Sequence, residues 1–198
     1  MEKKYQQLIN HITRITPLTE EEKSTICRYL SLRSVRRKQI LVADGDYTRN
    51  EHFVVKGCFR LFYVDKLGKE YIMRFAVENY WMTDLDSFTN GVPATQFVEA
   101  LEDGEVITLS KEAMDALLAD IPSLHKYFMT IYRNAVIATY LRIQQNFTMT
   151  VLDRYEIFRK KYPAIELRVP QYMIASYLGI TPEFLSKMKQ GMSSSKIE

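Results

Sequence analysis

The sequence predicts an α+β fold, because the spacing of its hydrophobic residues changes along the 198-residue chain. Short runs of β-branched and aromatic residues, separated by turn residues, occupy residues 32–109 and predict a jelly-roll-like β-roll. A helical pattern follows over residues 124–147, and two short helices joined by a tight turn are predicted over residues 169–190. We therefore expect three parts: a β-roll domain at residues 1–120, a long helix at 121–149 and a helical domain at 150–198.

The N-terminal part begins with short helices, which are predicted over residues 5–30. Leu8, Ile12 and Ile15 repeat at helical spacing, and Thr19 with Glu22 forms a capping-box pattern. Strands are then predicted at Gln39–Val42, His52–Val55, Phe59–Val64, Tyr71–Phe75, Phe97–Ala100 and Val106–Leu109. The turns between them carry glycine, at Gly45, Gly57, Gly68 and Gly104.

A helix is predicted over Lys111–Ala119, and a second, much longer helix begins after Pro122. The long helix carries a heptad-like seam with small residues, which runs through Leu124, Phe128, Ile131, Ala135, Ala138 and Arg142. A second apolar stripe lies on another face, at Tyr132, Val136, Tyr140, Ile143 and Phe147. Two apolar faces need two partners, so we expect the β domain to cover one and a second subunit to cover the other. We place the homodimer interface on the seam. The alternative is that both stripes are buried in one chain, which is disfavoured because such a helix projects beyond a small barrel.

The C-terminal part has the pattern of a helix-turn-helix. Thr150 with Asp153 starts a helix at Val151–Lys161, and Tyr162-Pro163 ends it. Further on, Gly179 stops a helix, and Thr181 and Pro182 start the next one as N-cap and first helical residue. The alternative is an ordinary helical hairpin in a core. In the helix-turn-helix interpretation, the helix that begins at Thr181 and Pro182 is the recognition helix and enters the major groove. The expected DNA contacts are Arg168, Gln171, Tyr172, Thr181, Pro182, Glu183, Ser186, Lys187 and Lys189.

The formal net charge of +3 is concentrated near the C-terminus. Residues 1–149 carry 19 basic and 19 acidic residues, whereas residues 150–198 carry 8 and 5, a difference of 3. This small excess gives weak support to nucleic-acid binding and suits a module that needs a dimer to bind well.

The remaining composition excludes several classes of protein. Cys27 and Cys58 are the only cysteines and have no metal-ligand spacing, so we expect neither a metal site nor a cysteine-bound cluster. The chain shows no signal-peptide pattern and no apolar run of transmembrane length. We expect a cytoplasmic protein without membrane contact.

The order of a β-rich domain, a long helix and a helix-turn-helix resembles the Crp/Fnr family of bacterial transcription regulators. Gly45, Gly57 and Gly68 fall where that family's β-roll turns, and the segment Arg168 to Lys189, RVPQYMIASYLGITPEFLSKMK, is similar to a branch built around IASYLGITPE. The resemblance implies a cyclic-nucleotide-binding-type β-roll, a dimerising helix, a winged helix and binding to double-stranded promoter DNA. Little sequence remains for the usual wing, so its phosphate contacts are expected to be absent or supplied by a strand pair before the two helices.

One departure from the family concerns its cyclic AMP site. Members that bind cyclic AMP carry Gly-Glu before a short helix and an Arg after it, because a phosphate needs a guanidinium and free N–H groups. Here Thr83 and Asp84 replace Gly-Glu, and Ala94-Thr95 stands where the Arg is required. We therefore expect no cyclic AMP binding, no cofactor and an unknown effector. The candidate ligand pocket is Tyr80, Trp81, Met82, Thr83, Asp84 and Thr95. A haem ligand stays open, at His11, His52 or His125.

A second departure concerns the base-reading turn. The family's Arg-Glu pair and the following Arg map onto Pro182, Glu183 and Lys187. Glu183 could accept a hydrogen bond from cytosine and Lys187 could donate to guanine, and the alternative for Glu183 is a capping charge alone.

The leading hypothesis is a homodimeric, sequence-specific transcription regulator whose β domain senses a signal or contacts RNA polymerase. The alternative is a small-molecule-binding β-roll module with degenerate DNA binding. An enzyme on a cupin-like barrel ranks third, because it needs closely spaced metal-ligating histidines and the three present are 41 and 73 residues apart. No catalytic constellation is recognisable, so we expect no enzyme.

Overall fold

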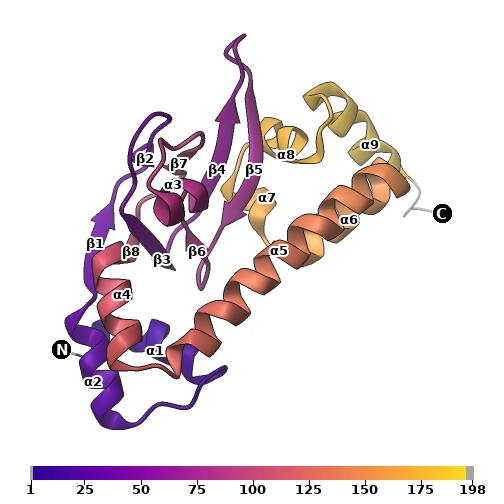
Figure 1. Ribbon diagram of the computed structural model, residues 1–198. Coiled ribbons are helices and arrows are strands. Elements are labelled where there is room, and N and C mark those ends of the chain that lie inside the picture. The colour runs from indigo at the N-terminus through magenta and orange to yellow at the C-terminus, as the bar shows by residue number, and fades with distance from the viewer. Residues whose placement is uncertain (1, 195–198) are drawn as a thin grey trace.

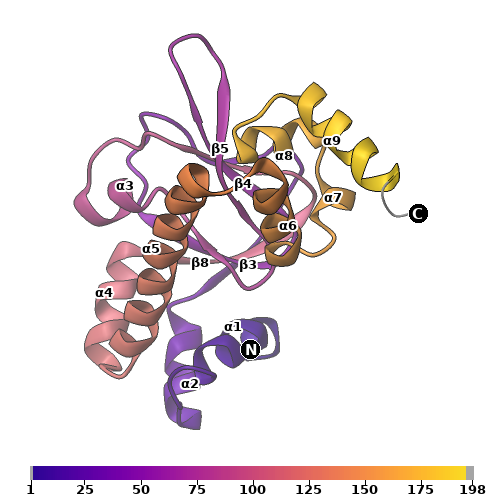
Figure 2. The ribbon, with the colours of Figure 1, turned by 90° about the vertical axis from the view of Figure 1, so that its right-hand side faces the viewer.

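The computed structural model describes residues 2–194 (Figure 1). The chain begins with a 3-10 helix, η1 (Glu2–Tyr5), followed by α1 (Gln6–Thr13) and α2 (Glu20–Arg28). The predicted capping box is confirmed: the Thr19 side chain accepts from the Glu22 amide, and the Glu22 carboxylate accepts from the Thr19 amide. These helices cover one end of the β-roll (Figure 2).

The β-roll consists of two four-stranded antiparallel sheets, in the strand orders β1-β8-β3-β6 and β2-β7-β4-β5. The strands are β1 (Ser31–Val35), β2 (Ile40–Val42), β3 (Asn50–Lys56), β4 (Phe59–Val64), β5 (Glu70–Ala76), β6 (Trp81–Met82), β7 (Phe97–Ala100) and β8 (Gly104–Ser110). Gly104 is required by a close approach, because a Cβ there would lie 2.3 Å from the Lys56 carbonyl oxygen. The six predicted strands are confirmed, and β1 and β6 were not predicted from the sequence.

The helix α3 (Leu85–Asn90) lies between β6 and β7. After β8 come α4 (Lys111–Asp120) and the long α5 (Leu124–Thr148). In Figure 1, α5 runs diagonally from the N-terminal helices toward the C-terminal ones. The structure corrects the expectation that Leu124 and Phe128 face a second subunit. Both side chains are buried in the core of their own chain, and Ile131 packs against the same cluster. Ala135 and Ala138 are half-buried.

The C-terminal part is formed by α6 (Val151–Lys161), α7 (Ile165–Arg168), α8 (Gln171–Leu178) and α9 (Pro182–Ser194). The expected start of α6 at a Thr150–Asp153 capping box is confirmed. The expected strand pair before the helix-turn-helix is wrong, because the short helix α7 occupies that position and residues 111–194 contain only helices and loops. The last four residues of the expected 150–198 part, including Ser195, lie outside the described residues.

The C-terminal helices share a hydrophobic core with the β-roll. Phe75 on β5 lies against Phe158, Tyr162 and Tyr177, with ring centroids 5.7–6.0 Å apart. Polar contacts accompany the packing, since Ser176 Oγ donates to the Glu70 carbonyl at 3.1 Å and accepts from the Ile72 amide at 3.1 Å. Figures 1 and 2 both place α8 beside β5. Within residues 2–194, no helix has the length and apolar character to span a membrane.

Candidate nucleic-acid interface

The turn between α8 and α9 is built by local chemistry. Gly179 adopts φ +71°, in the left-handed region that a residue with a Cβ enters only at a cost, and its amide donates to the Ser176 carbonyl. The Ile180 amide donates to the Ala175 carbonyl at 3.0 Å. Thr181 then caps α9, because its Oγ1 accepts from the Phe184 amide at 3.2 Å.

One buried residue anchors α9 and leaves its N-terminal face open. Leu185 is fully buried in the shared core, and Met188 is half-buried. The candidate base-reading residues are exposed: Thr181, Pro182, Glu183, Ser186 and Lys187, together with Gln171 and Tyr172 at the start of α8. This geometry presents the first two turns of α9 to the outside (Figure 2).

Glu183 takes part in the helix cap. Hydrogen bonds from its own backbone amide and from Thr181 hold the pKa of its carboxyl below the ordinary value. The side chain is therefore ionised at neutral pH and lies at the positive end of the helix dipole. This is the capping role that the sequence left open beside base reading.

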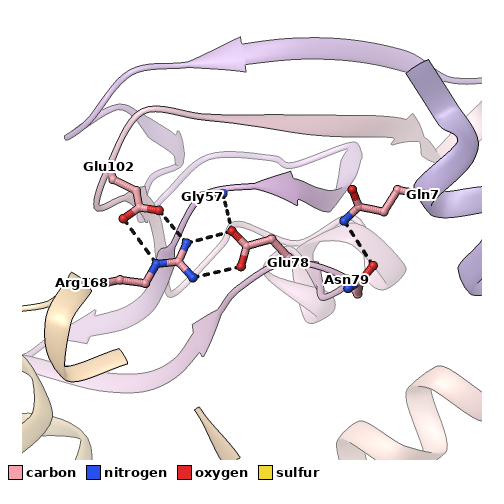
Figure 3. Close-up of polar contacts among 6 residues, drawn as sticks. All are labelled: Gln7, Gly57, Glu78, Asn79, Glu102 and Arg168. Carbon is pink, nitrogen blue, oxygen red and sulfur yellow. Dashed lines mark hydrogen bonds and ion pairs between the residues drawn. The ribbon is translucent and has the colours of Figure 1, made fainter. Parts of the chain in front are cut away.

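Two of the basic side chains that were expected to contact DNA form ion pairs within the chain. Lys189 is half-buried, and its Nζ lies 2.7 Å from Glu166 Oε1. The Arg168 guanidinium lies between Glu78 and Glu102 of the β domain, with four N–H···O contacts of 2.6–3.4 Å (Figure 3). The expectation that Arg168 faces DNA is therefore corrected: its charge is satisfied by two carboxylates.

The Arg168 cluster fastens the C-terminal helices to the β-roll. Glu78 also accepts from the Gly57 amide at 2.9 Å, at the turn between β3 and β4 (Figure 3). Burial alone would raise the pKa of Glu78, but the hydrogen bonds from Arg168 and Gly57 outweigh it and hold that pKa below its ordinary value. The cluster thus joins α7 to three connections of the β domain, those between β3 and β4, β5 and β6, and β7 and β8.

Sequence reasoning missed Phe184, whose side chain is 52% exposed on the first turn of α9. An exposed aromatic residue beside Glu183 and Lys187 can contact a thymine methyl group. The available signal was its position next to Leu185, which takes the inward place and turns Phe184 outward.

The candidate ligand residues of the β domain are mostly used by the fold. Trp81 and Met82 are buried, and the Trp81 indole donates to the Tyr127 hydroxyl on α5 at 2.8 Å. Thr83 donates to the Asn50 carbonyl at 2.9 Å. The buried Asp84 carboxylate accepts from the amides of Ser87, Thr95 and Gln96 at 2.9–3.2 Å. Tyr80 is half-buried and packs against Tyr162.

The candidate haem histidines have protein partners. His11 Nδ1 lies 2.8 Å from the Tyr127 hydroxyl, and the buried His52 Nδ1 lies 2.9 Å from Thr108 Oγ1. His125 contacts the Pro122 carbonyl. Over residues 2–194, no group of three or more His, Cys, Asp or Glu is placed to hold a metal ion.

The outer face of α5 carries four of the five residues of the second apolar stripe, whereas the fifth, Tyr132, is half-buried against the N-terminal core and donates to Glu51. Val136, Tyr140, Ile143 and Phe147 are 50%, 70%, 47% and 84% exposed, respectively. They repeat every three or four residues, the spacing of a helix-pairing seam. The stripe is therefore an uncovered apolar surface in the single chain.

Comparison with known proteins identifies the β-roll. Residues 32–120 match the family model of the cyclic nucleotide-binding domain. The chain around this cyclic nucleotide-binding-type domain has the fold of solved Crp/Fnr regulators. A sequence search against curated proteins returns no match.

Three of the similar solved structures cover nearly the whole chain. FixK2 from Bradyrhizobium japonicum superposes with a TM-score of 0.74 at 15% identity, covering 85% of this chain and 86% of that one. The c-di-GMP responsive global regulator CLP from Xanthomonas campestris gives 0.70 at 12% identity, covering 90% and 93%. A CooA mutant from Carboxydothermus hydrogenoformans gives 0.69 at 16% identity, covering 89% and 82%. The predicted α+β fold is thereby confirmed.

Proposed function

We propose that this chain is a homodimeric, sequence-specific DNA-binding transcription regulator. The observation that carries the proposal is the exposed N-terminal face of α9, held outward by the Gly179 turn and the buried Leu185. A helix of this kind enters the major groove with its first turns. The likeness of the fold to regulators such as FixK2 and CLP supports the proposal.

The base-reading residues we assign are Glu183, Phe184 and Lys187, all exposed on α9. Lys187 donates to guanine, Glu183 accepts from cytosine and Phe184 meets a thymine methyl group, and each good pair discriminates by about 1–3 kcal/mol. Arg168 is left out of this set because its guanidinium is bound by Glu78 and Glu102.

The homodimer is assigned to the outer stripe of α5. Packing Val136, Tyr140, Ile143 and Phe147 against the same residues of a second copy covers an apolar surface that the single chain leaves in water. Two copies also double the small positive excess of the C-terminal part, which strengthens the attraction to phosphates.

The signal we assign is something other than a cyclic nucleotide. Asp84 already occupies the amides of Ser87, Thr95 and Gln96, which an anionic phosphate at this helix would need. A phosphate beside the Asp84 carboxylate would meet a like charge in a buried site.

The proposal is tested by selecting bound sequences from random DNA with the full chain, followed by competition titrations at fixed salt. We expect enrichment of a two-fold symmetric site. Lys187→Ala should reduce the ratio of specific to random affinity by about tenfold or more, because both half-sites lose a base contact. Lys160→Ala is the matched control: this exposed lysine lies on α6 and leaves the ratio unchanged.

A selection without enrichment would contradict the proposal and favour the alternative, a small-molecule-binding β-roll module with degenerate DNA binding. If a site is enriched but Lys187→Ala leaves the ratio of specific to random affinity unchanged, the assignment of α9 to the major groove is wrong.

A further inference from the structure

A small cavity lies where α5, α6 and α8 meet. Its volume is about 180 Å³. The apolar part of its wall comes from Ala138, Leu141, Ile157, Phe158, Tyr177 and Leu178. An engineered cavity of about 150 Å³ holds benzene, so this space suits one small ring or a branched chain of similar size.

Three basic residues line this cavity: Arg142 from α5, and Arg154 and Lys161 from α6. The remaining polar lining is Gln145 and Asn146, and the lining residues include no Asp or Glu. Within residues 2–194, none of the three cations forms an ion pair. The cavity therefore holds positive charge without a counter-charge.

The two arginines are held in place by neutral oxygen atoms. Arg142 donates to the Met73 and Ile72 carbonyls and, at 2.7 Å, to the Tyr177 carbonyl, and its guanidinium lies over the Tyr177 ring. Arg154 Nη1 donates to Asn146 Oδ1 at 2.8 Å and to the Leu178 carbonyl at 2.9 Å. Carbonyls fix the orientation of a guanidinium without cancelling its charge, so both groups are pre-organised for an anion.

One donor at this site has no partner at all. The Nε atom of Arg154 is buried and has no hydrogen-bond acceptor. A buried unpaired N–H costs free energy, so the hydrogen-bonding capacity of the Arg154 guanidinium is not fully satisfied by the described residues. Desolvation lowers the pKa of Lys161, and the nearby positive charges of Arg74 and Arg142 lower that pKa further.

We propose that this cavity binds a small organic anion, a carboxylate or phosphate attached to an apolar group about the size of a benzene ring. The anionic oxygens accept from Arg154 and Lys161, and the ring lies against Leu141 and Phe158. Such a ligand bridges α5 to α6 and α8, and so connects the helix assigned to dimerisation with the helices assigned to DNA binding. Binding of this ligand is measured without DNA, so the result tests the inference independently of the proposed DNA-binding function.

The test is calorimetric titration of the full chain with benzoate and with phenyl phosphate, using benzamide as the neutral analogue. At least one of the two anions should bind saturably with a dissociation constant of about 1 mM or below, because few ligand atoms limit the affinity. Benzamide should bind at least about tenfold more weakly, since it leaves the cations unpaired.

Variants on one helix supply the matched comparison. Lys161→Gln should weaken the anion several-fold, and Arg154→Gln by about tenfold or more, because the charge-assisted contacts are lost. Lys160→Gln removes the same charge one residue away, outside the cavity, and should leave the affinity unchanged. If Arg154→Gln fails to fold, the Lys161 and Lys160 pair carries the test.

Three results would overturn the inference: no saturable binding of either anion, equal binding of benzamide, or an equal loss in Lys160→Gln and Lys161→Gln. An equal loss in the two variants would show that the anion is attracted by the overall positive charge of α6 and is not bound in the cavity.

Discussion

At the scale of single residues, the ionisation of the buried Glu51 is tied to folding. Its side chain is 3% exposed on β3, and it accepts from the Tyr132 hydroxyl of α5 at 2.8 Å. Burial raises the pKa of Glu51 to about 7, against the opposing effects of the Tyr132 hydrogen bond and the Arg74 charge. The native state therefore binds this proton more tightly than the unfolded chain.

We predict that this residue makes the free energy of unfolding fall as pH rises from about 4.5 to about 7. Above that range the native state carries a buried carboxylate, and the loss from pH 5 to pH 8 should be about 2–3 kcal/mol. The free energy of unfolding of Glu51→Gln, measured by urea unfolding at the same two pH values, should not show this loss. Buried His52, whose pKa burial lowers to about 4, acts in the opposite direction and is present in both proteins. Equal pH dependence of the two proteins would contradict the prediction.

A second prediction at this scale concerns Arg168. Arg168→Gln should lower the free energy of unfolding by about 1–2 kcal/mol, because Glu78 and Glu102 lose a partly buried partner. The slope of log affinity against log salt for DNA should stay unchanged, since the guanidinium neutralises carboxylates and not phosphates. A reduction of this slope by about one unit would instead indicate that Arg168 contacts a DNA phosphate.

At the scale of elements, the apolar residues of α5 fall into a buried set and an exposed set. Leu124 and Phe128 complete the core of their own chain, whereas Tyr140 and Phe147 lie in water. We predict that Tyr140→Glu shifts the protein from dimer to monomer in sedimentation, because two buried carboxylates would face each other across the α5 pair.

Leu167→Glu is the matched control, since Leu167 is 89% exposed on α7, away from the stripe, and its substitution should leave the dimer intact. A wild-type protein that sediments as a folded monomer at micromolar concentration would contradict the assignment.

At the scale of the whole molecule, the β-roll and the C-terminal helices are joined by one hydrophobic cluster. Phe75 lies at its centre and is fully buried. Phe75→Ala should therefore cost about 3–5 kcal/mol and destabilise both parts together. Phe184→Ala, at a half-exposed aromatic residue, should change the free energy of unfolding by less than about 0.5 kcal/mol.

The readouts are the fluorescence of Trp81, the single tryptophan, and far-ultraviolet circular dichroism. Trp81 lies in the core of the β-roll and the N-terminal helices, whereas the dichroism reports the helices of both parts. We expect coincident thermal transitions in the wild type. Separate transitions would show that the shared cluster does not couple the two parts.

The sequence alone determined the features that rest on neighbouring residues. The capping boxes at Thr19 and Thr150, the left-handed Gly179 and the start of α9 are all confirmed, because each depends on contacts within about five residues. The six strands predicted from runs of β-branched and aromatic residues are confirmed, because the preference of such residues for strands is also a local property. The mostly polar β1 and the two-residue β6 have too little pattern to detect, and pairing with β8 and β3 makes them strands.

Only the tertiary structure decided which groups meet across long stretches of chain. Arg168 is 90 residues from Glu78 and 66 from Glu102, so no local pattern indicates that its charge is already used. Both stripes of α5 have helix-pairing spacing, and the positions of the β-roll and of the N-terminal helices decide which of their residues are buried. The cavity that gathers Arg142, Arg154 and Lys161 likewise depends on the packing of three helices. Spacing along a helix tells which side chains share a face, whereas packing of the whole chain determines what that face meets.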